Sequence, residues 1–312
     1  MVLASAQITI TRPIACLQRS HTLSSYQRFL AICSSLIILA TEVFAVGSTP
    51  YVLENTEVVA IHASRLNRSY EIYVSFPEDY TTTNKHYPVV YVTDAPYAFP
   101  LIRAFAGRVD RHGVGLESFI LVGLSYAKGE SGVISRNRDY TPTERKRDPK
   151  SPGRSYGQSA AYLDYLTEDV FPLVDSRYRT DPKRRIFVGH SYGSLLGLQA
   201  LLERPNTFSH YILGSPSLWF DKGQPFDALR HYAKTHVDLK GKVRFYVGGL
   251  EQPSGNQPGG ENMVALMNRY VAELRGHHWR GLDVKAKVME GEDHATVFTR
   301  FVTQGLAWAL PK

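Results

Sequence analysis

Hydrophobic and polar positions along the first part of the chain predict a sheet. Residues 56–62 and 68–76 alternate between apolar and polar side chains, as two antiparallel strands do. Residues 87–94 and 119–126 are almost continuously apolar, which is typical of strands buried on both faces. This part therefore favours an antiparallel start followed by central, buried strands.

Strands and helices alternate along the rest of the chain. Further strands are predicted at 186–188, 210–214, 242–249 and, as an alternating edge strand, 282–289. Helices are predicted at 100–108, 160–177, 193–203, 262–276 and 297–310. Residues 131–156 are polar and rich in Arg, Pro and Gly, and predict a long functional loop. The order indicates an α/β fold, with a mostly parallel sheet that has an antiparallel start and helices on both faces.

Residues 189–193 form the pattern Gly-x-Ser-x-Gly, with Ser191 at its centre. An apolar run precedes the pattern and a leucine-rich helical run follows it, which is the context of a nucleophile elbow. Gly189 and Gly193 have no Cβ, so strand and helix can pass close together. N–H groups at the start of the helix can bind a developing oxyanion. The pattern predicts that Ser191 is a catalytic nucleophile; an ordinary turn before a helix is the alternative.

A serine nucleophile needs a histidine base, and the base needs a carboxylate that orients it. In α/β-hydrolases the acid and then the histidine follow the serine along the chain. His294 lies in a Gly-rich loop between the last predicted strand and the last predicted helix, so it is the predicted base. His190 is predicted to pack beside the site or border the substrate, because adjacent side chains in this turn point apart.

The orienting acid should follow the strand at 242–249. Glu251 is the first carboxylate after that strand and is the predicted acid. Glu261 and Asp221 are alternatives, and a Ser–His pair without a third member is a further one.

The oxyanion hole needs two N–H groups. One is expected from Tyr192, the residue after the nucleophile, and the other from the loop after the strand at 87–94. Pro96 in that loop has no N–H. The second donor is therefore Ala95 or Tyr97, and Ala95 is preferred.

The N-terminal segment has the pattern of a secretory signal peptide. Arg28 is followed by about a dozen apolar residues and then by small residues that end at Ala45. Residues 1–45 are therefore a predicted signal peptide, and 46–312 a single catalytic domain of a secreted or periplasmic protein without stable membrane insertion after cleavage. An uncleaved anchor helix is the alternative. Cys16 and Cys33 both lie in this segment, so its removal would leave no thiol for a disulfide or metal site.

Charge and metal-ligand patterns exclude several other functions. The net charge of +7 over 312 residues is a mild excess, and the densest basic run, 144–150, is broken by two acids and a proline. Nucleic-acid binders concentrate basic residues on one face, so no nucleic-acid partner is expected. No metal motif is present, and no metal or cofactor is predicted.

Several motifs together resemble a known family. They are Tyr87-Pro-Val-Val-Tyr-Val-Thr-Asp94, Val122-Gly-Leu-Ser-Tyr126, Arg136-Asn-Arg-Asp-Tyr-Thr-Pro142, Gly189-His-Ser-Tyr-Gly193, Ser215-Pro-Ser-Leu-Trp219 and Gly291-Glu-Asp-His294. The chain resembles the “putative esterase” branch of the α/β-hydrolases, which includes esterase D-like enzymes and enterobactin-type siderophore esterases. The motif at 136–142 is typical of the siderophore-esterase-like members. The chain departs from the family where Ala95 and Pro96 replace the glycine that often follows Asp94.

The resemblance implies hydrolysis of a small-molecule carboxylic ester through an acyl-enzyme, without a metal. It also implies that Arg138 and Arg136 lie near the substrate; the alternative is that Asp139 and Tyr140 fix a loop by hydrogen bonds. Siderophore trilactones are candidate substrates. Rival hypotheses are an esterase or acyltransferase acting on acetyl, feruloyl or cell-surface esters, and a non-catalytic protein that binds an anionic ligand.

Overall fold

A mixed eight-stranded sheet forms the centre of the unit Leu53–Lys312 in the computed structural model, which describes residues 48–113, 115–144, 154–253 and 261–312. The strands are β1 (Thr56–Ala63), β2 (Arg68–Ser75), β3 (Tyr87–Val92), β4 (Ile120–Leu124), β5 (Thr180–His190), β6 (His210–Gly214), β7 (Gly241–Gly248) and β8 (Leu282–Met289). Their spatial order is β1-β2-β4-β3-β5-β6-β7-β8. β1 and β2 pair antiparallel, β2 also pairs antiparallel with β4, and the remaining pairs are parallel. The predicted α/β-hydrolase fold is confirmed.

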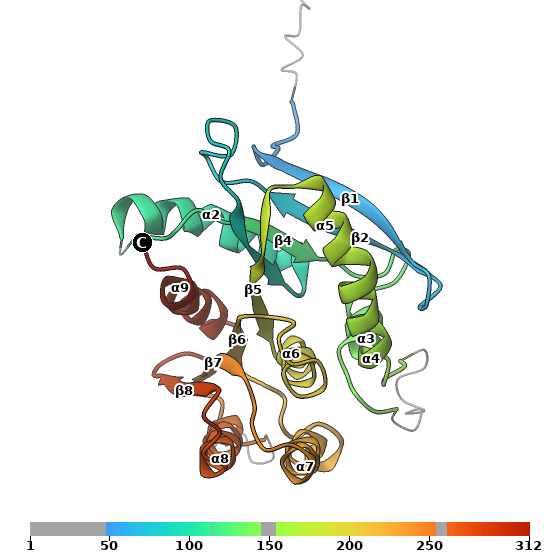
Figure 1. Ribbon diagram of the computed structural model, residues 1–312, viewed down its shortest axis with the longest axis vertical. Helices are drawn as coiled ribbons and strands as arrows, with labels where there is room; N and C mark the ends of the chain where they lie inside the picture. The colour runs from blue at the N-terminus through green and yellow to red at the C-terminus, as the bar shows by residue number, and fades with distance from the viewer. Residues whose placement is uncertain (1–47, 114, 145–153, 254–260) are drawn as a thin grey trace, which may run out of the picture. The chain divides into compact units, whose positions relative to one another are not determined.

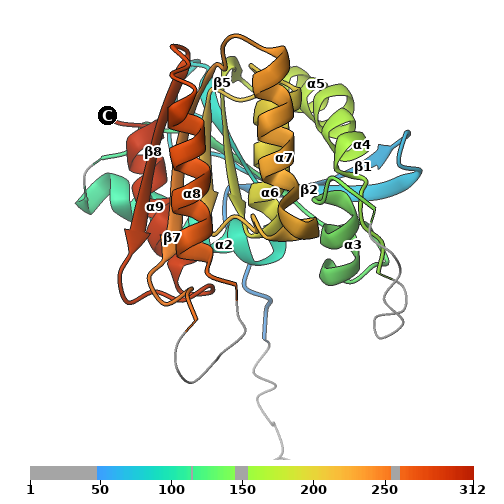
Figure 2. The ribbon, with the colours of Figure 1, turned by 90° about the horizontal axis from the view of Figure 1, so that it is seen from below.

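Helices cover both faces of this sheet (Figure 1). On one face lie α2 (Ala95–His112) and α9 (Val297–Ala309). On the other lie α4 (Ser159–Tyr165), α5 (Phe171–Arg177), α6 (Tyr192–Glu203), α7 (Phe220–Thr235) and α8 (Met263–Gly276). Figure 2 shows α7 and α8 side by side along the sheet.

Successive side chains near the end of β5 explain why residues 186–188 are all apolar. Phe187 packs in the core on the α6 side, while Ile186 and Val188 pack in the core on the α9 side. Side chains alternate between the two faces of a strand, so a strand covered on both faces needs apolar residues at every position.

The structure corrects part of the predicted secondary structure. The polar stretch at 131–156 is not a loop throughout, because it contains α3 (Gly132–Asp139), which Ser131 caps by accepting a hydrogen bond from the N–H of Ile134 (3.3 Å). Residues 145–153 lie outside the described part. The sequence analysis also missed α7, whose backbone is non-helical at Asp221–Gly223 and which contains Pro225. Glycine and proline are weak helix formers, which hides this helix from a periodicity search.

The predicted signal peptide lies outside the described residues. Among the residues that the structure describes, no helix is long and apolar enough to cross a membrane.

Candidate active site

The Gly-x-Ser-x-Gly turn connects β5 directly to α6. Ser191 has φ 58° and ψ −117°, a strained backbone for a residue with a side chain, and its N–H donates to the carbonyl of Gly214 (2.9 Å). A Cβ on Gly189 would overlap the carbonyl oxygen of Gly193. The glycine is therefore required by the close approach of strand and helix, as the sequence predicts.

Two residues predicted for the triad are brought together at the carboxyl end of the sheet. Glu251 follows β7 and His294 follows β8, and His294 Nδ1 lies 2.5 Å from Glu251 Oε2. The Glu251 side chain is only 3% exposed, whereas that of His294 is 47% exposed. A buried carboxylate hydrogen-bonded to one ring nitrogen fixes the tautomer and leaves the other nitrogen for proton transfer.

The alternative acids are placed elsewhere. Asp221 accepts a hydrogen bond from the Thr143 hydroxyl (2.6 Å), and Glu261 is exposed before α8. Neither is paired with His294 among the described hydrogen bonds, so the geometry favours Glu251.

His294 lies beside the elbow through its contact with His190. The two imidazole rings are 4.6 Å apart, and His190 immediately precedes Ser191. The described hydrogen bond of the Ser191 hydroxyl is with the Ser217 hydroxyl, 3.2 Å away. Hydrogen bonds between nucleophile and base are often absent before substrate binds, and a rotation of the serine side chain changes its partner.

His190, at the end of β5, packs against the ring of His294. It is buried, and its ring also packs against Phe298 and Phe301 of α9. Burial, together with the neighbouring His294 and Arg136, lowers the pKa of His190 to about 3. The ring is therefore neutral near pH 7 and adds no positive charge beside His294. Its burial favours the prediction that His190 packs beside the site over the prediction that it borders the substrate.

The predicted oxyanion donors lie at two helix N-termini. Tyr192 begins α6 and Ala95 begins α2. The first N–H groups of a helix have no acceptor within that helix. The N–H of Tyr97, the alternative donor, is hydrogen-bonded to the carbonyl of Asp94 (3.2 Å), which favours Ala95.

Arg136 links the loop before α2 to the elbow. Its Nε donates to Asp94 Oδ1 (2.9 Å), and its guanidinium lies 5.4 Å from the ring centre of Tyr192. Asp94 is fully buried, in a left-handed conformation with φ 59°. The Arg136 side chain keeps 21% exposure, so part of its charge remains accessible beside the predicted site.

Arg138 is buried in a hydrogen-bond network, which favours a structural role over the predicted contact with substrate. The side chain is 2% exposed and donates to Asp139 (2.8 Å) and Glu130 (2.5 Å). Asp139 also accepts hydrogen bonds from Tyr70 (3.0 Å) and Ser135 (2.9 Å). These hydrogen bonds hold α3 against the sheet and engage the guanidinium of Arg138. They agree with the alternative from the sequence, in which this motif fixes a loop by hydrogen bonds.

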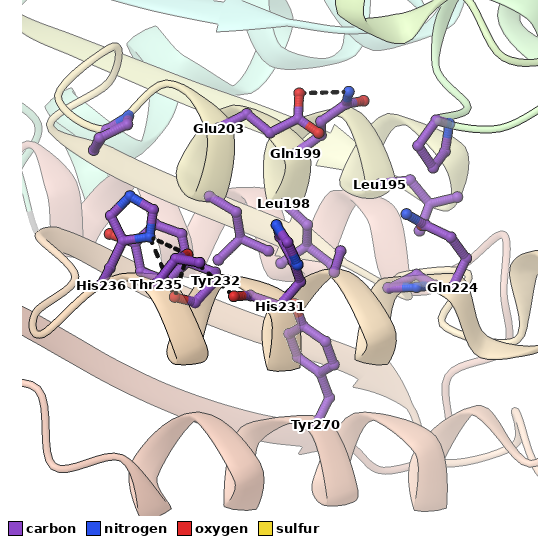
Figure 3. A pocket seen from close by; sticks show the side chains of 15 residues that line it. Leu195, Leu198, Gln199, Glu203, Gln224, His231, Tyr232, Thr235, His236 and Tyr270 are labelled. Carbon is purple, nitrogen blue, oxygen red and sulfur yellow. Dashed lines mark hydrogen bonds between the residues drawn. The ribbon is translucent and has the colours of Figure 1, made fainter.

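A separate cavity of about 340 Å³ lies between α6 and α7 (Figure 3). Its walls are apolar residues such as Leu195, Leu198 and Tyr270, and its rim carries His231 and His236. Ser191, Glu251 and His294 do not line it, so this cavity is distinct from the catalytic candidates.

Two functional candidates were not recognised from the sequence. Ser215 and Ser217 belong to a motif quoted for the family resemblance, but no role was assigned to either. Ser215 donates to Glu251 (2.5 Å), and Ser217 contacts Ser191. The available signal was the Ser-Pro-Ser sequence directly after a buried strand, at the sheet edge where the other candidates gather.

This strand order, with a serine at a strained strand-to-helix turn and a histidine–carboxylate pair after the last strands, is that of an α/β-hydrolase. Residues 63–296 match the family described as “Putative esterase”. The chain therefore belongs to this family and is a carboxylic-ester hydrolase, as the motifs indicated.

Two proteins with similar sequences are named as esterases of siderophores. The chain is 28% identical over 274 residues to “Ferri-bacillibactin esterase BesA” of Bacillus subtilis, an alignment that covers 84% of this chain and 92% of the relative. “Siderophore triacetylfusarinine C esterase” of Aspergillus fumigatus is 30% identical, over 62% of this chain and 64% of its own.

Solved structures confirm the fold. “Siderophore hydrolase EstB from Aspergillus nidulans” aligns with a TM-score of 0.71 and 25% identity, over 85% of this chain and 98% of its own. “BES protein from Bacillus cereus” aligns with a TM-score of 0.72 and 24% identity, over 86% of this chain and 100% of its own.

Proposed function

We propose that this protein hydrolyses siderophore-type esters with a Ser191–His294–Glu251 triad. The observation that carries the proposal is the 2.5 Å contact between His294 and the buried Glu251, next to the strained turn that holds Ser191. The names of the similar proteins support a siderophore ester as the substrate class.

In the proposed reaction the Ser191 hydroxyl attacks the ester carbonyl while His294 takes its proton. Glu251 stabilises the resulting imidazolium and keeps the ring oriented. The N–H groups of Tyr192 and Ala95 stabilise the oxyanion, each by about 3 kcal/mol. His294 then returns the proton to the leaving alcohol, and water hydrolyses the acyl-enzyme by the same route.

Arg136 is the proposed contact for the substrate's negative charge. A ferric catecholate siderophore is anionic, and a partly exposed guanidinium beside the elbow would attract it. The ion pair with Asp94 fixes the position of this guanidinium, which reduces the entropy lost on binding.

The test is a panel of esters, including a trilactone siderophore and a p-nitrophenyl ester, assayed with wild type, Ser191→Ala and Glu261→Ala. Ser191→Ala should abolish hydrolysis of both esters and block labelling by a fluorophosphonate, while Glu261→Ala should leave both rates near wild type. Full activity of Ser191→Ala would overturn the mechanism. Hydrolysis of the p-nitrophenyl ester without any siderophore turnover would overturn the substrate class alone.

The domain and export predictions belong to the same proposal. We propose that residues 46–312 are the mature, single-domain enzyme, delivered outside the cytoplasm after removal of residues 1–45. Mass spectrometry of the N-terminus of the protein recovered from the periplasm or culture medium tests this. A full-length protein found only in the cytoplasm would contradict it.

A further inference from the structure

Ser215 occupies a strained position at the carboxyl end of β6. It is fully buried, and its φ of 42° lies in the left-handed region that favours glycine. Its N–H donates to the carbonyl of Tyr246 (2.7 Å), so the backbone is held in place from the neighbouring strand. A serine at this position carries backbone strain that a glycine would avoid.

The Ser215 hydroxyl completes the hydrogen bonding of the Glu251 carboxylate. Oε1 accepts from Ser215 Oγ (2.5 Å) and from the N–H of Gly248 (2.8 Å), while Oε2 faces His294 Nδ1 (2.5 Å). Two donors on one oxygen fix the rotation of the carboxylate, so the other oxygen points at the imidazole. Without the hydroxyl, only the backbone donor would oppose rotation.

We propose that Ser215 is a fourth, positioning member of the catalytic group, which acts on the reaction only by orienting Glu251. This inference rests on the proposed triad. Glycine would relieve the backbone strain at this position but would remove the hydroxyl. Ser215→Gly therefore removes the hydroxyl without adding backbone strain.

The experiment is a double-mutant cycle between Ser215→Gly and Glu251→Ala, with kcat and KM measured on a p-nitrophenyl ester. A hydrogen bond to a charged group predicts that Ser215→Gly lowers kcat about tenfold with little change in KM. In the Glu251→Ala background the same substitution should change kcat by less than about twofold, because the carboxylate it orients is gone.

Ser194→Ala is the matched control. Ser194 is also fully buried, but its hydroxyl donates to the backbone carbonyls of Gly189 (2.9 Å) and Gly214 (2.7 Å) and not to the carboxylate. Its effect on kcat should therefore be the same factor in both backgrounds. Ser215→Ala, which keeps the Cβ, provides a second variant if the glycine substitution prevents folding.

The outcomes separate this inference from the proposed function. An equal effect of Ser215→Gly with and without Glu251, or no effect in either background, overturns the positioning role. Full activity of Glu251→Ala or of Ser191→Ala would instead overturn the triad on which the inference rests.

Discussion

Replacing His190 by glutamine should make the protein less sensitive to acid. His190 is buried against His294 and α9, and burial, with the nearby His294 and Arg136, lowers its pKa from 6.5 to about 3. An unfolded chain binds a proton at this imidazole near its ordinary pKa, but the native protein does not. The unfolded state therefore binds more protons between about pH 6.5 and 3, and the free energy of unfolding falls as the pH decreases through this range.

The pKa difference sets the size of the effect. Between pH 7 and pH 5, His190 should lower the free energy of unfolding by about 2 kcal/mol. This is a large share of the ~5–15 kcal/mol that stabilises a typical domain. Burial also lowers the pKa of His210, to about 4, so His210 adds to the loss of unfolding free energy on acidification. This contribution is the same in wild type and variant and cancels in the comparison.

The assay is urea unfolding of wild type and His190→Gln at pH 7 and pH 5. Any change in the free energy of unfolding that the substitution causes equally at both pH values cancels when each protein is compared with itself at pH 7 and pH 5. The loss of stability on acidification should be about 2 kcal/mol smaller in the variant. His190→Phe, which also cannot titrate, should behave in the same way. An equal loss in wild type and both variants would refute the argument that His190 is held neutral by burial.

Three further substitutions test other parts of the site. Arg138→Ala should lower the free energy of unfolding by about 3 kcal/mol, because it leaves Asp139 buried without its cation. The KM of the folded fraction should not change, and a large rise in KM would restore a substrate role. Gly189→Ala should abolish activity or folding, since its Cβ would overlap the Gly193 carbonyl, and a variant with normal kcat and melting temperature would contradict this. Ser217→Ala should preserve fluorophosphonate labelling of Ser191 and speed it a few-fold, because it removes the Ser191–Ser217 hydrogen bond that must break before attack. Loss of labelling would place Ser217 in the reaction itself.

The sequence by itself predicted the features that depend on local pattern. Continuous apolar runs gave the buried strands, since a strand covered on both faces has no position for a polar side chain. The elbow was readable because close packing of strand and helix demands glycine at Gly189, whatever the rest of the chain does. His294 and Glu251 followed from the order of elements, because loops after parallel strands meet at one edge of the sheet.

Tertiary structure alone decided which polar residues face the site and which support it. Arg138 and Arg136 are two positions apart in one motif, yet Arg138 is buried and Arg136 remains partly exposed. The Arg138 guanidinium also donates to the Tyr70 hydroxyl of β2, 68 residues away in sequence, and no local pattern reports a contact so distant. Ser215 likewise depends on β6 and β7 lying side by side, which brings its hydroxyl to Glu251. Burial and hydrogen-bond partners are properties of the packed chain, because they arise only when segments far apart in sequence exclude water together.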